Sequence, residues 1–343
     1  MTAAAGSLSW KQRALQHAQP ICAMLELTYR CNWRCGFCYN PRHRDLRGLK
    51  GAEWVEVIVE LRELGTLTVT LTGGEPLLHP DFFRIARAVR EQGFALRVFT
   101  NGSLIDAETA QRLAELHPMG VELSLHGATA ATHDGTTGTP GSWSSLVQAL
   151  DRLEASGVRV LLKTPLTRLN EGELDAMIAF AAERRVPYLV DPTLSPRDDG
   201  SMKPLEYSAS DDVIASLLRN PTVRTSLGEQ VREKGGVNCG LGRITLAVDP
   251  EGNVYPCPQW RHSSLGNVRD TRLTTLWRES EARRQAAEVA RLANDRLLEA
   301  GGPVARFAFC PALAFRTTGD PTRPDARTSG RAALVAKLRA AEP

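Results

Sequence analysis

The segment Cys31-Asn-Trp-Arg-Cys35-Gly-Phe-Cys38 places three cysteines within eight residues, with the spacing C-x3-C-x2-C. Three thiolates on one short loop can bind three irons of a [4Fe–4S] cluster, and the fourth iron then lacks a protein ligand. A cluster with four cysteines mostly transfers electrons, whereas an open iron can bind a substrate or a cofactor. The segment therefore predicts a cluster with a reactive coordination position.

A zinc site is the alternative interpretation of the same segment. His43 lies five residues beyond Cys38, so a Cys3His site is conceivable. Zinc knuckles end quickly, however, and this loop is followed by a long series of alternating strands and helices. That context favours the iron–sulfur interpretation.

The composition is that of an ordinary globular protein. The chain has 343 residues, enough for two domains, and its net charge of +3 is too small to indicate a nucleic-acid partner. It shows no signal peptide and no apolar stretch of the roughly 20 residues that span a bilayer. We therefore expect a cytoplasmic protein with no membrane partner. Its seven cysteines are then better explained as ligands than as disulfides, with Cys22 as a small core residue.

Strands and helices alternate from residue 21 to about residue 194. We predict strands at 22–28, 67–72, 95–100, 120–125, 158–164 and 188–193. The helices predicted between them are 51–64, 81–92, 106–116, 142–156 and 171–184. Six strand–helix units predict an α/β fold, namely an open, partial (β/α)6 TIM-like barrel with parallel strands.

Several residues mark the ends of these predicted helices. Asp106 and Ser142 are expected to be N-caps, because their side chains can accept a backbone hydrogen bond. Gly65, Gly93 and Gly157 stand where a helix needs a left-handed residue at its C-terminus.

Four loops that follow the predicted strands carry reactive or conformationally special residues. They are residues 31–38, 73–76, 100–102 and 124–127, after the first four strands in order. In barrels of this type the chemistry collects at the carboxyl ends of the strands. The four loops therefore predict one active site at one rim of the barrel.

The rest of the chain predicts a small α+β region with three more cysteines. Residues 244–248 and 254–257 flank the turn segment 249–253 and are expected to form a β-hairpin, in which Cys257 falls beside Thr245 if Val248 faces Val254. A helical segment at about 271–300 and a short helix at 330–341 are expected to follow. We divide the chain into an N-terminal extension (1–20), a barrel (21–205), a helical linker (206–236), a hairpin-plus-helix iron–sulfur domain (237–316) and a tail (317–343).

These motifs resemble the signature of radical S-adenosylmethionine (SAM) enzymes. The cysteine loop has an aromatic residue, Phe37, before its last cysteine, and Gly73-Gly74-Glu75-Pro76 is similar to the GGE motif of that family. The resemblance covers about residues 21–194. It implies that the cluster on Cys31, Cys35 and Cys38 binds the amino and carboxylate groups of SAM. Reduction of the bound SAM would then give a 5′-deoxyadenosyl radical, which abstracts a hydrogen atom from the substrate.

The resemblance also implies SAM-binding roles for individual residues. Phe37 would contact the adenine through its backbone. The methionyl ammonium would be held by Gly73, Gly74 and Glu75, because a carboxylate is a fitting acceptor for a cation. The ribose or the carboxylate would be reached by Asn101 and Ser124, and the methionyl carboxylate would pair with Lys163.

Each of these residues also has a structural interpretation. The glycine pair and Asn101 could belong to ordinary turns. Surface or core contacts could satisfy Ser124 and Lys163. We interpret His126 as structural, and no general base is identified.

The C-terminal region resembles the SPASM domain, or its shortened form, the twitch domain. A full SPASM domain has enough cysteines for two auxiliary clusters, whereas this region has Cys239, Cys257 and Cys310. We therefore expect one auxiliary [4Fe–4S] cluster. Its fourth ligand could be the substrate, a side chain other than cysteine, or a cysteine outside the pattern. Zinc or plain core cysteines are the alternative.

Residues 163–170, 191–200 and 310–321 are similar to stretches in maturases of ribosomally made peptides, although 191–200 could equally be an ordinary surface loop. We therefore expect oxidative modification of a precursor peptide, specifically a crosslink between side chains. The runner-up is a radical SAM dehydrogenase or cofactor-biosynthesis enzyme that acts on a small molecule. A zinc-binding scaffold or interaction protein is a third class.

The expected partners follow from this chemistry. A reductant such as flavodoxin or ferredoxin would supply electrons. Many peptide maturases carry an N-terminal leader-binding domain, whereas only residues 1–20 precede the first predicted strand. We therefore expect a separate leader-recognition protein or direct binding of the substrate.

Overall fold

Ten strands form one continuous sheet within the computed structural model, which describes residues 9–40, 43–45, 47–220, 224–225, 227 and 230–340. The strand order is β10-β9-β8-β1-β2-β3-β4-β5-β6-β7. The strands are β1 (Cys22–Thr28), β2 (Thr68–Gly73), β3 (Ala95–Thr100), β4 (Gly120–Ser124), β5 (Val160–Pro165), β6 (Tyr188–Asp191), β7 (Arg224–Thr225), β8 (Thr245–Val248), β9 (Asn253–Tyr255) and β10 (Gly266–Asn267). All neighbouring pairs are parallel except β8–β9 and β9–β10.

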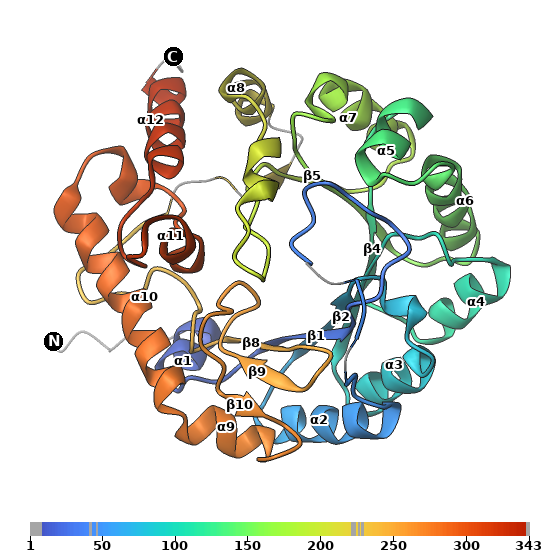
Figure 1. Ribbon diagram of the computed structural model, residues 1–343, viewed down its shortest axis with the longest axis horizontal. Helices are drawn as coiled ribbons and strands as arrows, with labels where there is room; N and C mark the ends of the chain where they lie inside the picture. Colours follow the sequence, from blue (N-terminus) through green and yellow to red (C-terminus); the bar gives the residue numbers. More distant parts are fainter. Residues whose placement is uncertain are drawn as a thin grey trace, which may run out of the picture.

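Helices alternate with the parallel strands and cover the outer face of the curved sheet (Figure 1). They are α1 (Trp10–Gln16), α2 (Gly51–Glu63), α3 (Phe82–Glu91), α4 (Ala107–Glu115), α5 (Ala130–Thr137), α6 (Ser142–Ala155), α7 (Leu174–Glu183), α8 (Asp211–Arg219), α9 (Leu273–Glu279), α10 (Glu281–Ala300), α11 (Pro311–Thr318) and α12 (Ala326–Ala340). The 3-10 helices are η1 (Pro76–Leu78), η2 (Glu171–Glu173), η3 (Lys203–Tyr207) and η4 (Pro303–Arg306). The architecture confirms the expected partial barrel.

The strand period of two explains which side chains face the barrel interior. In β1, Ala23, Leu25 and Leu27 are buried in the main hydrophobic core beneath the outer helices. Successive side chains of a strand point to opposite faces. Glu26 and Thr28 therefore lie on the inner face, at the end of the strand where the cysteine loop begins.

The helix-end predictions have mixed outcomes. Asp106 is the N-cap of α4 and accepts a hydrogen bond from the backbone nitrogen of Thr109 at 2.8 Å, as predicted. The glycines at 65, 93 and 157 have φ values of 75°, 80° and 70°, which confirms their left-handed conformation.

The N-cap prediction for Ser142 is wrong, because Ser142 is the first residue of α6 and Gly141 precedes it as the N-cap. The carboxylate of Asp134, in the middle of α5, accepts from the backbone nitrogens of Gly141 at 2.6 Å and Trp143 at 2.8 Å. This carboxylate replaces the cap that the Ser142 hydroxyl was expected to supply.

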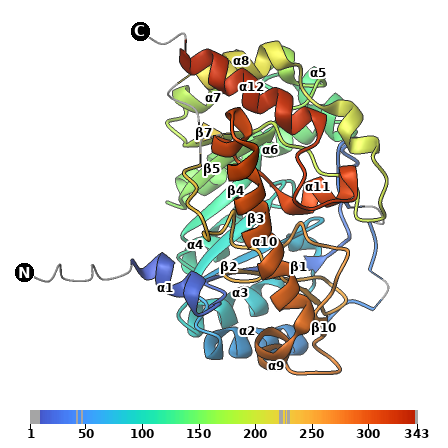
Figure 2. The ribbon, with the colours of Figure 1, turned by 90° about the vertical axis from the view of Figure 1, so that its left-hand side faces the viewer.

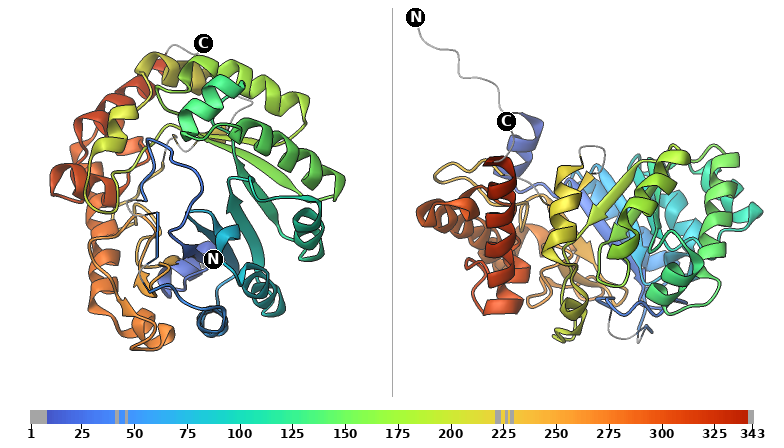
Figure 3. Two further views of the ribbon diagram at one scale, coloured as in Figure 1. Left: turned by 45° about the vertical axis from the view of Figure 1, so that its right-hand side comes forward. Right: turned by 90° about the horizontal axis from the view of Figure 1, so that it is seen from above.

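The predicted hairpin is confirmed and joins the barrel sheet. Val248 pairs with Val254, and β8 lies parallel to β1 with Cys22 opposite Thr245. Beyond it, α12 packs against α8 and η4, and α10 packs against η4 and α11. These C-terminal helices close the ring on the side where the sheet is open (Figures 2 and 3).

Three helices were not predicted, namely α1, α5 and α11, and one predicted helix is interrupted. The segment expected at 271–300 breaks at Ser280, whose side chain caps α10 by accepting from the backbone nitrogen of Arg283. The serine hydroxyl competes with helical continuation, which explains the break.

Cys22 is exposed, so its prediction as a core residue is wrong. It is the first residue of β1 and lies on the strand face opposite to that of Ala23, which enters the core. None of the helices that the structure describes combines the length and apolar character required to cross a bilayer.

Leu25→Ala tests the central position of β1 in the core. The Leu25 side chain is fully buried, so we expect the free energy of unfolding to fall by about 2–5 kcal/mol in urea denaturation. Leu67→Ala is the control, since Leu67 is 53% exposed, and it should cost about 0.5 kcal/mol or less. Equal losses in both variants would contradict this assignment of the core.

Candidate active site

The cysteine loop follows β1 and lies inside the ring of strands and helices (Figure 1). Asp45 fixes it to the end of β1: its Oδ2 accepts from Thr28 Oγ1 at 2.5 Å, and its Oδ1 accepts from the Tyr29 nitrogen at 2.6 Å. Asn40 Nδ2 donates to the Tyr29 carbonyl at 2.7 Å. Sequence reasoning missed Asp45 and Asn40, because their partners are set by the path of the loop.

The glycine pair brings the loop after β2 against the residues that lead into the cysteine loop. The Gly74 nitrogen donates to the Thr28 carbonyl at 2.7 Å, and the Glu75 nitrogen donates to the Arg30 carbonyl at 2.8 Å. A Cβ atom on Gly74 would lie 2.2 Å from the Arg30 oxygen. Gly73 has φ +133°, and a Cβ there would lie 2.4 Å from the Thr28 oxygen. Only glycine allows this approach at both positions.

Glu75 is fully buried and joins this contact to β3. Its Oε1 accepts from Thr100 Oγ1 at 2.7 Å and from the Leu77 nitrogen at 3.1 Å, and its Oε2 accepts from the Asn101 nitrogen at 2.8 Å. Burial raises the pKa of Glu75 to about 7, and these hydrogen bonds oppose the rise. A carboxylate has about four acceptor positions, so one remains for a further donor.

Asn101 connects Glu75 with the cysteine loop. Its Nδ2 donates to Asn32 Oδ1 at 2.8 Å and lies 4.0 Å from the Cys31 sulfur. Its Oδ1 accepts from the Ser103 hydroxyl at 2.6 Å. The structure therefore places Asn101 beside the predicted cluster loop and adds Asn32 and Ser103, which the sequence did not single out.

The three thiols of the cysteine loop lie within electrostatic reach of one another, and burial raises the pKa of Cys31 to about 11. The Trp33 nitrogen donates to the Cys31 sulfur at 3.4 Å. Among the described residues, no group of three or more His, Cys, Asp or Glu side chains is gathered closely enough for a single metal ion. A four-iron cluster does not require such a group, because each thiolate binds a different iron. The donors of this loop therefore fit a [4Fe–4S] cluster.

Aromatic rings support the cysteine loop from the side of β4. His126 makes edge contacts with Trp33 and Phe37, with ring centroids 5.9 Å and 5.3 Å apart. Burial lowers the pKa of His126 to about 3, and the neighbouring His133 adds to the effect. A neutral imidazole packed among rings fits the structural interpretation of His126.

Ser124 and Lys163 are neighbours in the sheet, because β4 and β5 pair them directly. The Lys163 Nζ lies 3.7 Å from Glu122 Oε2 and 4.5 Å from the centroid of the Phe99 ring. Lys163 is therefore paired with a protein carboxylate on the inner face of the barrel. Apart from the charge of Glu122, no sequence pattern indicated this partner.

The second set of cysteines, which we name the auxiliary triplet, consists of Cys239, Cys257 and Cys310. All three pack against one apolar cluster, formed by Leu241, Trp260, Ala286, Ala290 and Ala312. Cys310 is the N-cap of α11. Burial raises the pKa of the Cys310 thiol, and the backbone amides of Leu313 and Ala312 in the first turn of α11 oppose the rise. Amide donors at a helix N-terminus stabilise a thiolate. The auxiliary triplet therefore also fits a cluster.

A buried ionic network connects the two sets of cysteines. Arg261 Nη2 lies 2.5 Å from Glu26 Oε1, on the inner face of β1, and Arg261 Nε lies 4.0 Å from Asp198 Oδ2. Asp198 Oδ1 also lies 3.6 Å from Nη1 of Arg316, in α11. The backbone nitrogen of Asp198 donates to the Tyr39 carbonyl at 2.9 Å. Tyr39 follows Cys38, Arg261 is close to Cys257, and Arg316 lies in the helix that Cys310 caps. The network thus fixes the auxiliary triplet relative to the cysteine loop.

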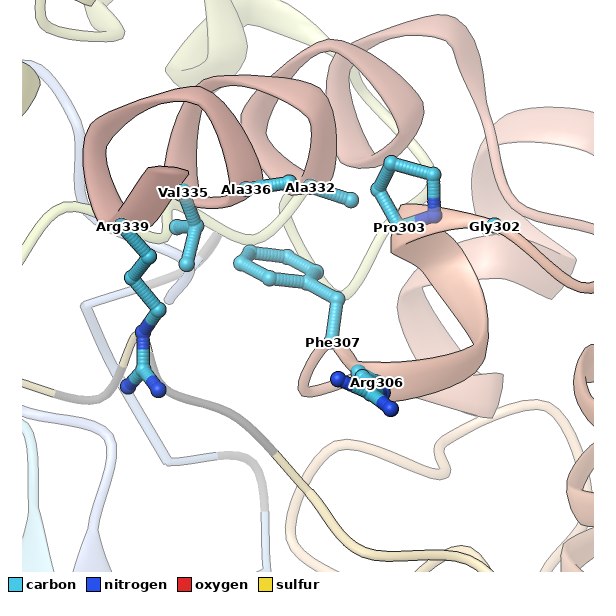
Figure 4. Close-up of a pocket in the computed structure, with 8 residues that line it drawn as sticks. All are labelled: Gly302, Pro303, Arg306, Phe307, Ala332, Val335, Ala336 and Arg339. Atoms are coloured by element: carbon cyan, nitrogen blue, oxygen red, sulfur yellow. The ribbon is translucent and has the colours of Figure 1, made fainter. Parts of the chain in front are cut away.

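A separate groove lies between η4 and α12 (Figure 4). Phe307, Ala332 and Val335 are buried beside it, and Arg306 and Arg339 lie at its edge. None of the predicted site residues lines this groove.

Gly74→Ala tests the close contact between the two loops. Because its Cβ would lie 2.2 Å from a backbone oxygen, we expect the melting temperature and the iron content after reconstitution to fall, with a stability loss of about 1–3 kcal/mol. Gly135→Ala is the matched control, because an added Cβ there meets nothing within 4 Å in α5, and it should stabilise slightly. Wild-type stability and iron content in Gly74→Ala would disprove the contact.

Arg261→Met tests the ionic network. The substitution leaves Glu26, which is 1% exposed, without its cation, and we expect a loss of about 3–5 kcal/mol in the free energy of unfolding. Adding Glu26→Gln should recover part of that loss, because no buried charge is then uncompensated. Strictly additive effects in this double-mutant cycle, measured by urea denaturation, would show that the two side chains do not interact.

Comparison with known proteins assigns the two regions. A family model described as "Radical SAM superfamily" matches residues 25–181, and one described as "Iron-sulfur cluster-binding domain" (SPASM) matches residues 239–300. The chain is 32% identical over 287 residues to a mycofactocin maturase of Mycobacterium ulcerans, covering 78% of this chain and 77% of that protein. It is 27% identical over 330 residues to a PqqA peptide cyclase of Ruegeria pomeroyi, covering 89% and 86%.

Two further similarities complete the comparison. An Fe-coproporphyrin III synthase of Methanosarcina barkeri is 25% identical over 290 residues, covering 73% of this chain and 72% of that protein. The crystallised enzyme anSMEcpe with bound AdoMet superimposes with a TM-score of 0.65 at 16% identity, covering 93% and 97%, and so shares the fold. The chain belongs to the radical SAM superfamily, as a member with a C-terminal SPASM iron–sulfur domain.

Proposed function

We propose that this radical SAM enzyme oxidatively modifies a ribosomally made precursor peptide by joining two of its side chains. The observation that carries the proposal is the similarity to the PqqA peptide cyclase over 89% of the chain, because the name of that relative states a peptide substrate. The 32% identity to a mycofactocin maturase supports the same class. Two separate sets of cysteines inside one fold agree with an oxidation that needs more than one redox centre.

We propose that Cys31, Cys35 and Cys38 bind three irons of the SAM-binding cluster. When SAM is bound and the cluster is reduced, these groups supply a 5′-deoxyadenosyl radical that removes a hydrogen atom from the substrate. The protein orients the cofactor. Asp45 and the close backbone approach at Gly73 and Gly74 would hold the cysteine loop in place. The rings of Trp33 and His126, beside Phe37, would shield the loop from water.

The methionyl ammonium of SAM would be held at the loop of Gly73, Gly74 and Glu75. Three donors of the chain already use part of the Glu75 carboxylate, and the remaining acceptor position suits an ammonium group. Asn101 follows the last residue of β3, and Ser124 is the last residue of β4. From these positions they would contact the ribose or the carboxylate of SAM. A role for Lys163 at the methionyl carboxylate would add a second carboxylate beside Glu122, which the three donors of its ammonium group allow.

The auxiliary triplet would bind one [4Fe–4S] cluster, whose fourth ligand is not a cysteine of this set. Joining two side chains removes two hydrogen atoms. The 5′-deoxyadenosyl radical takes one of them, and the other leaves as a proton, released to solvent, and one electron, which a second cluster can accept. Flavodoxin or ferredoxin is the expected reductant of the first cluster. A separate leader-recognition protein would present the peptide.

A small-molecule substrate is the second candidate. The similarity to an Fe-coproporphyrin III synthase favours it, because that relative is named for a tetrapyrrole product. The two candidates predict the same cofactors and differ in the substrate that donates the hydrogen atom.

Cysteine variants test the cofactor assignment. Anaerobic reconstitution should give about eight irons per chain, that is, two clusters of four. Cys35→Ala should abolish release of 5′-deoxyadenosine from SAM and dithionite. Cys257→Ala should lower the iron content to about four and leave a cluster that still cleaves SAM. Cys22→Ala, at an exposed cysteine, is the control and should match the wild type. Zinc without iron in the wild type would overturn the assignment.

The substrate class is tested by isotope transfer. Any short peptide encoded beside the gene is made in fully deuterated form and incubated with the reconstituted enzyme, SAM and reductant. Deuterium in the released 5′-deoxyadenosine, with a loss of two mass units in the unlabelled peptide, supports the proposal. Unlabelled 5′-deoxyadenosine and an unchanged peptide, with transfer from a porphyrin substrate instead, would favour the second candidate.

A further inference from the structure

Each cysteine of the auxiliary triplet has a buried or partly buried arginine within electrostatic reach. The positive charge of Arg261 acts on Cys257, that of Arg316 on Cys310 and that of Arg232 on Cys239, and each favours the thiolate form. Two of these arginines are neutralised by carboxylates, since Arg261 pairs with Glu26 and Arg316 with Asp198. Within the described residues, Arg232 forms no ion pair with a carboxylate.

Arg232 is 9% exposed and donates to neutral oxygen atoms. These are the carbonyls of Ala305 at 2.9 Å and Phe307 at 2.7 Å, the side chain of Asn238 at 2.7 Å and that of Gln230 at 3.0 Å. Asn238 precedes Cys239 and also donates to the carbonyl of Phe309, next to Cys310. The guanidinium therefore lies between the two chain segments that carry Cys239 and Cys310.

A buried guanidinium without an anion is unfavourable, and arginine does not lose its proton at ordinary pH. Burial lowers the pKa of Arg232, and the charged group that opposes this effect among the described residues is Cys239. Its Nε is also buried without a hydrogen-bond partner in the described structure, so one donor remains for an acceptor. A negative charge at the auxiliary triplet would compensate the guanidinium, which lies between the segments of Cys239 and Cys310.

We propose that Arg232 is the counter-ion of the auxiliary cluster and raises its reduction potential. The inference rests on the proposed auxiliary cluster and adds a positioning and tuning residue to it. Reduction adds one negative charge to a cluster, and a fixed cation in a buried site stabilises that charge. Arg232 thus makes the auxiliary cluster a better electron acceptor.

The test is a redox titration of the full-length reconstituted protein, followed by electron paramagnetic resonance. A background with Cys31, Cys35 and Cys38 changed to Ala leaves the auxiliary cluster as the only signal. We expect Arg232→Gln to lower the equilibrium constant for reduction about tenfold, which is ~59 mV for one electron. Arg232→Lys keeps the charge and should retain most of the wild-type potential. Arg306→Gln is the control, because Arg306 is exposed and lies between Ala305 and Phe307, whose carbonyls accept from Arg232.

The outcomes separate this inference from the proposed function. A potential that falls in Arg232→Gln but not in Arg232→Lys or Arg306→Gln supports it. Equal potentials in all variants with four irons retained would overturn the tuning role and leave the proposed cluster intact. Equal loss of iron in both Arg232 variants would show a purely structural role and also overturn it. No iron in the cysteine-loop background would overturn the auxiliary cluster and this inference together.

Discussion

The close backbone contact between residues 28–30 and residues 73–75 is the constraint on which the rest of the site depends. Two strand ends can approach this closely only because Gly73 and Gly74 have no side chain. The contact sets the start of the cysteine loop, and the buried Glu75 carries the same constraint to β3 through Thr100 and Asn101. The cysteine loop and the carboxyl ends of β2 and β3 are therefore one unit, assembled from three neighbouring strands.

The second set of cysteines depends on a different kind of interaction. Its hairpin extends the barrel sheet beside β1, and the network around Arg261, Glu26 and Asp198 ties it to the residue after Cys38. Buried ion pairs add little net stability, but they penalise any arrangement that separates them. The network thus fixes the relative placement of the two sites more than it stabilises the fold.

Much of this organisation could be predicted from the sequence because it is local. Strand periodicity predicted β1 and β3 at their observed bounds, and the turn segment 249–253 predicted the hairpin, in which Val248 pairs with Val254. The remaining features depend on partners distant in sequence. No local pattern indicates that β8 pairs with β1, that Asp134 caps α6, or that Lys163 meets Glu122. Cys22 was misplaced because its apolar neighbours do not show which strand face it occupies.

The account's central claim is that the two sets of cysteines hold two clusters, of which only one binds SAM. Mössbauer spectroscopy of the full chain reconstituted with 57Fe, with and without SAM, tests this claim most directly. We predict two [4Fe–4S] clusters, one of which gains a distinct iron site when SAM is added while the other is unchanged. A spectrum of a single cluster, or of two clusters that are both unchanged when SAM is added, would contradict the account.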